Sequence, residues 1–301
     1  MQALQRLGSM GAIPGNIHRD LQRKYFHKLV APAPWKITTN MLMKEDGQRV
    51  SKTTECHVLL PHSWALSLEE GDLFEKVMCK DDDLVQFWKT QKQNPQMSSD
   101  MWRSLDFTKP SQLPVPYVLH GDGAPYTEID SLQVLSLRCM LSSRSVSEAQ
   151  LLLCAIPKLA AEEETFRSIM STLAWSFKAL REGRAPKVDV DGKAVDGPGA
   201  RGKRFRRGWL WCITGDLEWY AQEFGFPFAA SNFLCPYCKA DQKKKGTENP
   251  FTDFRPTASW RHTVRSKQDM EKLYGSHPLF KGVPGLSVCS IKLDTLHTLD
   301  L

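Results

Sequence analysis

Short apolar runs separated by polar or turn-forming residues occupy the middle of the chain. Three of them follow one another: "VPYVLHGDG" from residue 115, "LQVLSLRCML" from residue 132 and "AQLLLCAIPKLA" from residue 149. Runs of this length and spacing predict three consecutive strands of a partly or fully buried sheet. In the third run Ala, Gln and Leu also favour a helix, and Pro157 could end either kind of element.

A helical period follows these runs. In residues 162–183, "EEETFRSIMSTLAWSFKALREG", apolar residues recur every three or four positions, acidic residues come first, and Lys178 and Arg181 lie near the end. This pattern predicts an amphipathic helix. Its acidic first turn and basic last turn would interact favourably with the helix dipole. Residues 183–202 are rich in Gly, Pro and charge and predict an exposed loop. Beyond the loop, "GWLWCIT" predicts a fourth strand and "LEWYAQEFG" a short helix.

The first 110 residues have a different pattern. Amphipathic pieces such as "RDLQRKYFHKLV", "SWALSLEEGDLFEKVM" and "DDLVQFWKTQKQN" alternate with Pro, Asn and charged residues. We therefore expect a mainly helical N-terminal region (1–110), a core with a sheet and helices (111–228) and a further segment (229–301). The predicted fold class is α/β or α+β.

Composition narrows the class of protein. Of the 301 residues, 41% are hydrophobic and 25% charged, which is ordinary for a soluble globular protein. No stretch approaches the about 18 uninterrupted apolar residues of a membrane helix, so we expect no membrane partner. The N-terminus lacks the apolar segment of a secretory signal, which favours an intracellular protein. The net charge of +6 mildly favours a polyanionic partner.

Two aspartates end apolar strands. Asp216 closes "GWLWCITGD" before a predicted helix, where it would either cap the helix or take part in chemistry. Asp122 lies in a Gly-Asp-Gly sequence, which suits a turn or a ligand site. Two carboxylates held close together repel each other unless a divalent cation lies between them, and oxygen ligands select Mg²⁺ or Mn²⁺. Paired ions of this kind promote phosphodiester cleavage.

The cysteines are too few for a disulfide scaffold. Of the eight, only Cys235 and Cys238, in "CPYC", have the spacing of metal ligands. The pair predicts a structural zinc knuckle, with His262, His277 and Cys289 as candidates for the remaining ligands. The alternative is a pair of free or redox-active thiols.

Basic residues gather in two places. The sequence "RGKRFRR" precedes the fourth strand, and a lysine triplet follows the Cys pair. Such clusters are candidates for contacts to nucleic-acid phosphates, with a solvated surface as the alternative. The candidate residues are Arg201, Lys203, Arg204, Arg206, Arg207, Lys243, Lys244 and Lys245.

The order of several motifs resembles that of the eukaryotic DDE/D cut-and-paste DNA transposases, nearest the CACTA (En/Spm-like) group. The motifs are the Gly215-Asp216 pair, a helix ending at Gly225-Phe226, the Cys235–Cys238 pair and the Asp-x-x-His element formed by Asp294 and His297. The resemblance covers about residues 113–301. It implies a ribonuclease-H-like mixed sheet flanked by helices, which brings Asp122 and Asp216 together on neighbouring strands. It also implies Mg²⁺ or Mn²⁺, cleavage and strand transfer of DNA, and action in the nucleus.

The sequence departs from this family at the third acid. That residue is usually a Glu on a later helix, and the sequence has no counterpart before it ends four residues after His297. We therefore expect a fragment or a decayed element, in which His297 lies beside the carboxylates or packs in the core. Three functions stay open: a transposase-like nuclease, a non-catalytic DNA-binding relic, and a structural domain in which both aspartates are turn caps. Association with a second copy of the chain is also open.

Overall fold

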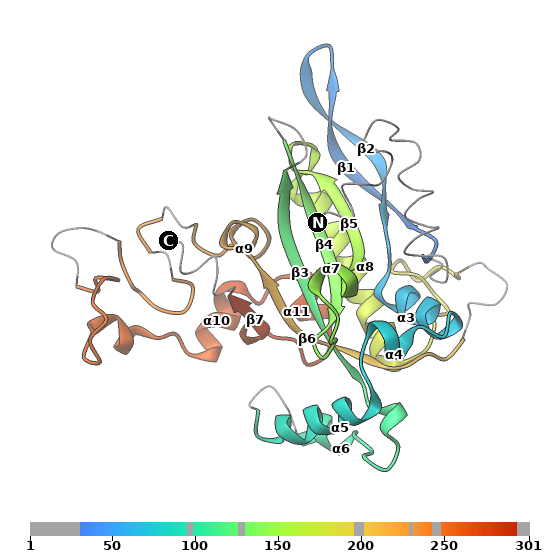
Figure 1. The fold of residues 1–301 in the computed structure, drawn as a ribbon. Coiled ribbons are helices and arrows are strands. Elements are labelled where there is room, and N and C mark those ends of the chain that lie inside the picture. Colours follow the sequence, from blue (N-terminus) through green and yellow to red (C-terminus); the bar gives the residue numbers. More distant parts are fainter. Residues whose placement is uncertain are drawn as a thin grey trace.

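A five-stranded mixed sheet organises the chain in the computed structural model, which describes residues 31–94, 99–125, 130–195, 202–228, 231–233, 235–242 and 248–293. Helices flank the sheet, and a two-stranded hairpin projects beyond it (Figure 1). The expected combination of a mixed sheet with flanking helices is therefore confirmed. The Cys-x-x-Cys segment lies in irregular chain between the fourth and fifth strands of this sheet.

The strands of the sheet follow an order that differs from their order in the chain. They are β3 (Val115–Pro125), β4 (Ser131–Cys139), β5 (Leu151–Pro157), β6 (Gly208–Gly215) and β7 (Ile291–Leu293). Their order across the sheet is β5-β4-β3-β6-β7, with β3–β4 and β4–β5 antiparallel and β3–β6 and β6–β7 parallel. The three predicted consecutive strands are confirmed, and the ambiguous third run is a strand. The fourth predicted strand pairs with the first, as expected.

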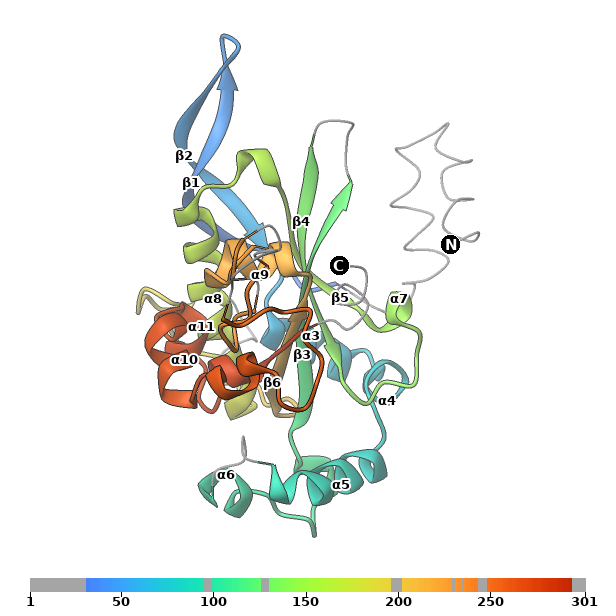
Figure 2. The ribbon, with the colours of Figure 1, turned by 90° about the vertical axis from the view of Figure 1, so that its left-hand side faces the viewer.

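The longest helix, α8 (Glu163–Glu182), connects β5 to β6 and packs against β6. The backbone N–H of Glu162 donates to Thr165 Oγ1 at 2.9 Å, and Gly183, with φ of 66°, ends the helix. The shorter α9 (Leu217–Phe224), α10 (Lys267–Tyr274) and α11 (Pro278–Gly282) follow β6. Figure 2 shows α8, α9 and α11 on one side of the sheet.

The N-terminal region contains helices and also a hairpin that the sequence analysis did not predict. The helices are α3 (Pro61–Glu70), α4 (Phe74–Val77), α5 (Asp81–Thr90) and α6 (Ser99–Arg103). Residues assigned to the mainly helical region also form β1 (Trp35–Glu45) and β2 (Gln48–Val58), an antiparallel pair. Asp46 and Gly47 join them with φ of 47° and 82°, as a two-residue hairpin turn requires. This Asp-Gly signal was overlooked.

Short helical pieces complete the fold: α7 (Val146–Ala149) and the 3₁₀ turns η2 (Gln91–Gln93), η3 (Pro110–Gln112), η4 (Lys158–Ala160), η5 (Ser259–Thr263) and η6 (Val288–Ser290). None of the helices in the described ranges is both long and apolar enough to cross a membrane.

The hydrophobic core continues across the expected boundary at residue 110. Trp88 of α5 is fully buried, and its ring lies 4.9 Å from that of Trp209 and 5.3 Å from that of Trp211. Its indole Nε1 donates to the carbonyl of Pro114 at 2.7 Å. The tryptophans of β6 therefore belong to the core, and the N-terminal helices share that core.

Candidate active site

The carboxyl ends of β3 and β6 lie side by side. In the parallel pairing of these strands, His120 is opposite Thr214 and Gly121 is opposite Gly215. The next residue of each strand segment is one of the predicted aspartates, Asp122 and Asp216. Because neighbouring strands are about 4.8 Å apart, this register places Asp122 of β3 next to the end of β6, directly after which Asp216 follows.

A buried indole explains the glycine that precedes each aspartate. The Trp219 side chain of α9 packs against both glycines, and it is only 2% exposed. A Cβ atom on Gly121 would lie 2.1 Å from Trp219 Cε2, and one on Gly215 would lie 2.4 Å from Trp219 Cε3. The two Gly-Asp pairs are therefore packing elements that seat α9 on the sheet. Since side chains alternate along a strand, Asp122 faces away from the indole.

Asp216 caps the helix that follows it. Its backbone is extended, with φ of −77° and ψ of 167°, and its Oδ1 accepts the backbone N–H of Trp219 at 2.5 Å. The cap interpretation is thus confirmed. The cap occupies one carboxylate oxygen, and Oδ2 makes no hydrogen bond with the described part of the chain. A cap of this kind leaves an oxygen for a further ligand.

Asp122 is not a turn residue, because it lies inside β3 opposite Val134 of β4. The interpretation of both aspartates as turn caps is therefore wrong. The Asp122 side chain is 48% exposed, and its Oδ2 is 3.9 Å from His120 Nε2. The other ring nitrogen, Nδ1 of His120, lies 3.1 Å from Thr214 Oγ1.

His120, Thr214 and Asp122 therefore form a polar group on one face of two adjacent strands. The sequence analysis did not identify Thr214. The signal was its position two residues before Asp216, which puts both residues on the same side of an extended chain.

The other two members of the predicted acidic site, Asp294 and His297, lie outside the described residues. Within the described ranges no group of three or more His, Cys, Asp and Glu side chains is arranged to hold a metal ion. The magnesium or manganese site stays a prediction.

The Cys235–Cys238 pair lies in a loop held by one arginine. Arg265 Nη1 is 3.3 Å from the carbonyl oxygen of Cys235 and 3.4 Å from that of Cys238. Burial raises the pKa of the Cys238 thiol to about 11, so this thiol is protonated near neutral pH unless a metal displaces the proton. His262 is exposed on η5. Zinc binding stays a prediction, with the pair of free thiols as its alternative.

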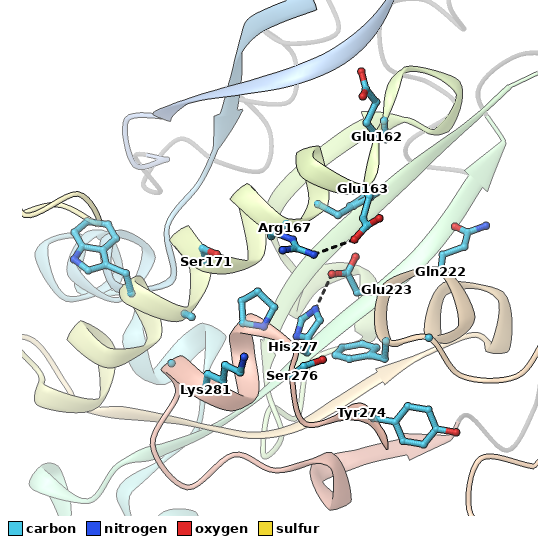
Figure 3. Close-up of a pocket in the computed structure, with 18 of the residues that line it drawn as sticks. Glu162, Glu163, Arg167, Ser171, Gln222, Glu223, Tyr274, Ser276, His277 and Lys281 are labelled. Carbon is cyan, nitrogen blue, oxygen red and sulfur yellow. Dashed lines mark hydrogen bonds and ion pairs between the residues drawn. The ribbon is translucent and has the colours of Figure 1, made fainter. Parts of the chain in front are cut away.

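His277 performs a different role from the one predicted. It lines a groove of about 1400 Å³ over α8, α9 and α11 (Figure 3). His277 Nε2 lies 2.8 Å from Glu223 Oε1, and its Nδ1 accepts the backbone N–H of Leu279 at 3.3 Å. Because both ring nitrogens are engaged, His277 clamps α11 to α9 and is not a zinc ligand in this structure. The clamp was not foreseen, since Glu223 is 54 residues away in the sequence.

Arg206 of the basic cluster has a largely buried side chain. Its side chain is 9% exposed, forms an ion pair with Asp81 and lies with its guanidinium carbon 4.7 Å from the centroid of the Phe74 ring. The expectation that Arg206 contacts DNA is not compatible with this burial. Its position in the cluster instead reflects the packing of α4 and α5 against the segment before β6.

The remaining cations of the cluster are more accessible. Lys203 pairs with Glu70 at 2.7 Å with both side chains about half exposed, and Arg207 Nη2 donates to the carbonyl of Gln112 at 2.8 Å. Arg204 is exposed and has no ionic partner among the described residues. Arg201 and Lys243–Lys245 lie outside the described residues.

Comparisons with known proteins identify no relative. No family model matches the sequence, and no curated protein or solved structure gives a significant match.

Proposed function

We propose that this chain is a transposase-like, metal-dependent nuclease with a ribonuclease-H-like core. The support at the level of the fold is the connectivity of the sheet. Three antiparallel strands are followed by helix α8, a fourth strand parallel to the first, and a fifth parallel to the fourth. This arrangement has the layout on which the resemblance to DDE/D transposases depends.

The observation that carries the proposal is the alignment of three strand ends. Gly121 of β3 pairs with Gly215 of β6, which pairs with Leu293 of β7. In the sequence, each of these three residues is followed by an aspartate: Asp122, Asp216 and Asp294. The carboxyl ends of neighbouring parallel strands meet at one edge of a sheet, where ligands of such sheets commonly bind. We propose that these three carboxylates are the acidic ligands of the site.

The donor set fits a hard divalent cation. Carboxylate oxygens select Mg²⁺ or Mn²⁺, and such an ion would stabilise the attacking and leaving oxygens at a phosphodiester. Asp122, half exposed, and Asp216, through Oδ2, would hold the cation. Hydrolysis would join a water oxygen to phosphorus and break the P–O3′ bond, with a proton released from the water and one taken up by O3′, which would give a 5′-phosphate and a 3′-hydroxyl. His120 lies between the Asp122 carboxylate and Thr214, and it would hold Asp122 in position.

The proposed partner is DNA, and the proposed location is the nucleus. Lys203, Arg204 and Arg207 remain candidates for phosphate contacts, together with Arg201 and Lys243–Lys245. Zinc at the Cys235–Cys238 pair would have a structural role in the segment between β6 and β7. Assembly with a second copy of the chain is compatible with this function.

A non-catalytic DNA-binding relic is the second candidate. The cap made by Asp216 supports it, because the hydrogen bond to the Trp219 backbone accounts for an aspartate at this position without any metal. The two candidates agree on DNA binding and differ in metal binding and cleavage.

Two measurements on the full chain separate these candidates. The first is Mn²⁺ binding by titration calorimetry on the wild type, Asp122→Asn, Asp216→Asn and Asp294→Asn. The exposed Asp191→Asn is the matched control for removing one carboxylate. The second is nicking of a supercoiled plasmid with Mn²⁺ by the same proteins.

The nuclease proposal predicts that each of the three variants loses at least tenfold in Mn²⁺ affinity and nicks at the background rate, while Asp191→Asn behaves as the wild type. Nicking by the wild type is expected to be slow, because the third acid of the family's later helix has no counterpart. Unchanged Mn²⁺ affinity in Asp122→Asn and Asp216→Asn would refute the metal site. Salt-sensitive DNA binding without nicking would identify the relic.

A further inference from the structure

The segment between α9 and α10 exposes an unusual number of aromatic side chains. Phe254 is 76% exposed, more than any other large hydrophobic residue described as exposed. Other exposed phenylalanines lie in the same segment: Phe228, Phe233 and Phe251. In Figure 1 this segment, coloured orange, lies outside the five-stranded sheet, on the side of β7. Four exposed phenylalanines within one segment make this segment a candidate binding surface.

The turn that presents Phe254 is well fixed. Trp260 Nε1 donates to the carbonyl of Asp253 at 2.7 Å, and Arg261 Nε donates to the carbonyl of Arg255 at 3.2 Å. The guanidinium carbon of Arg261 lies 4.8 Å from the centroid of the Trp260 ring. The residues on either side of Phe254 are therefore held by a stacked Trp–Arg pair, while the Phe254 ring itself projects to solvent.

The charge around this turn is positive. Residues 235–267 contain eight Lys and Arg and three Asp and Glu. Asp253 neutralises Arg255 through two hydrogen bonds at 2.9 and 2.8 Å. Arg261 donates to a backbone carbonyl and not to a carboxylate, so its charge is available to an anion.

We propose that Phe254, Trp260 and Arg261 form a stacking platform for unpaired nucleotides of single-stranded DNA. Aromatic rings stack on bases, and neighbouring cations contact the phosphates between them. Bases in a duplex are already stacked on each other, so the platform selects single strands. We favour DNA over a protein partner because the sequence of this segment has eight Lys and Arg against three Asp and Glu, an excess of positive charge that attracts a polyanion.

This inference builds on the proposed DNA-directed function but needs no metal. Binding is therefore measured in EDTA, where metal-dependent cleavage does not occur. Fluorescence anisotropy of a labelled oligo-dT and of a duplex of the same length is followed as each is titrated with the full chain. The variants are Phe254→Ala, Phe254→Leu and Phe254→Trp, with Val264→Ala as the matched control, since Val264 is an exposed apolar residue of the same segment.

Phe254→Ala and Phe254→Leu each remove the ring on which one base stacks. We therefore expect both variants to bind oligo-dT about five- to 150-fold more weakly than the wild type. Phe254→Trp and Val264→Ala retain the wild-type affinity, and duplex affinity is the same in all variants. Arg261→Gln also weakens oligo-dT binding and reduces its salt dependence.

Three results would overturn the platform: an unchanged affinity in Phe254→Ala, wild-type binding by Phe254→Leu, or equal losses for oligo-dT and duplex. The surface would instead belong to a protein partner if the wild-type chain bound neither oligonucleotide and if sedimentation showed self-association that Phe254→Ala abolished. Because Asp122→Asn and Asp216→Asn must bind oligo-dT normally in EDTA, failure of the nuclease proposal and failure of the platform are separable.

Discussion

The contact between Gly121 and Trp219 provides the sharpest test of how the acidic site is built. Replacing Gly121 by Ala puts a methyl group 2.1 Å from Trp219 Cε2 and 2.4 Å from Cδ2 and Cζ2. Carbon atoms in contact are normally about 3.5–4.0 Å apart, so the overlap exceeds about 1 Å on three ring atoms. Gly123 is the matched control, because it lies on the same face of β3 and a Cβ there meets no atom within 4 Å.

The indole has little freedom to move away from the new methyl group. It is 2% exposed, its ring lies 5.4 Å from that of Phe224, and its backbone N–H is bound by Asp216. Overpacking of a core typically costs about 1–3 kcal/mol, and we expect Gly121→Ala to lie at the upper end of that range. Gly123→Ala should be neutral or stabilising by about 0.5–1 kcal/mol, because Ala loses less backbone entropy than Gly in a strand.

Urea unfolding of the full chain, followed by far-UV circular dichroism, measures the free energies of unfolding. We expect the two variants to differ by about 3 kcal/mol. In a Trp219→Ala background the Gly121→Ala change should cost less than about 0.5 kcal/mol, since its steric partner is gone. The packing argument is refuted if Gly121→Ala and Gly123→Ala unfold with the same free energy, or if the cost of Gly121→Ala persists without the indole.

Three further predictions concern other parts of the molecule. Burial lowers the pKa of His62 to about 4, so the folded state resists its protonation. The free energy of unfolding should therefore fall by about 3 kcal/mol as the pH drops from 6.5 to 4, and His62→Asn should flatten that part of a pH-dependent unfolding series. Arg206→Gln should lower the free energy of unfolding by about 1–3 kcal/mol, because it removes the ion pair with the partly exposed Asp81 and the contact with the Phe74 ring, whereas the exposed Arg204→Gln should change stability by less than about 0.5 kcal/mol and mainly reduce DNA affinity. Atomic emission spectroscopy should find zinc in the purified wild-type chain and none in a variant with serine at both Cys235 and Cys238. An equal zinc content in the two proteins would favour the alternative that the pair consists of free thiols.

Local patterns in the sequence were sufficient to predict the main elements. The apolar runs from residues 115, 132, 149 and 208 form strands, and the three- and four-residue period of residues 163–182 forms α8. These patterns report which side chains must be buried within one element, and that depends only on nearby residues. The cap was one of the two roles that the sequence offered for Asp216, and it could be foreseen because a cap bonds to a residue only three positions away. The β1–β2 hairpin had a local signal as well, the Asp46-Gly47 pair, which the amphipathic pieces of the same region obscured.

Contacts between distant residues were decided only by the tertiary structure. His120 meets Thr214 across 94 residues, and Arg206 meets Asp81 across 125. A run of cations has the same sequence pattern whether its side chains are exposed or packed against another element, so the sequence did not distinguish Arg206 from Arg204. The role of the glycines before Asp122 and Asp216 was likewise invisible until α9 was placed on the sheet. Sequence determines which groups need partners, and the packing of distant elements determines which partners they meet, because burial and close contact are properties of the whole fold.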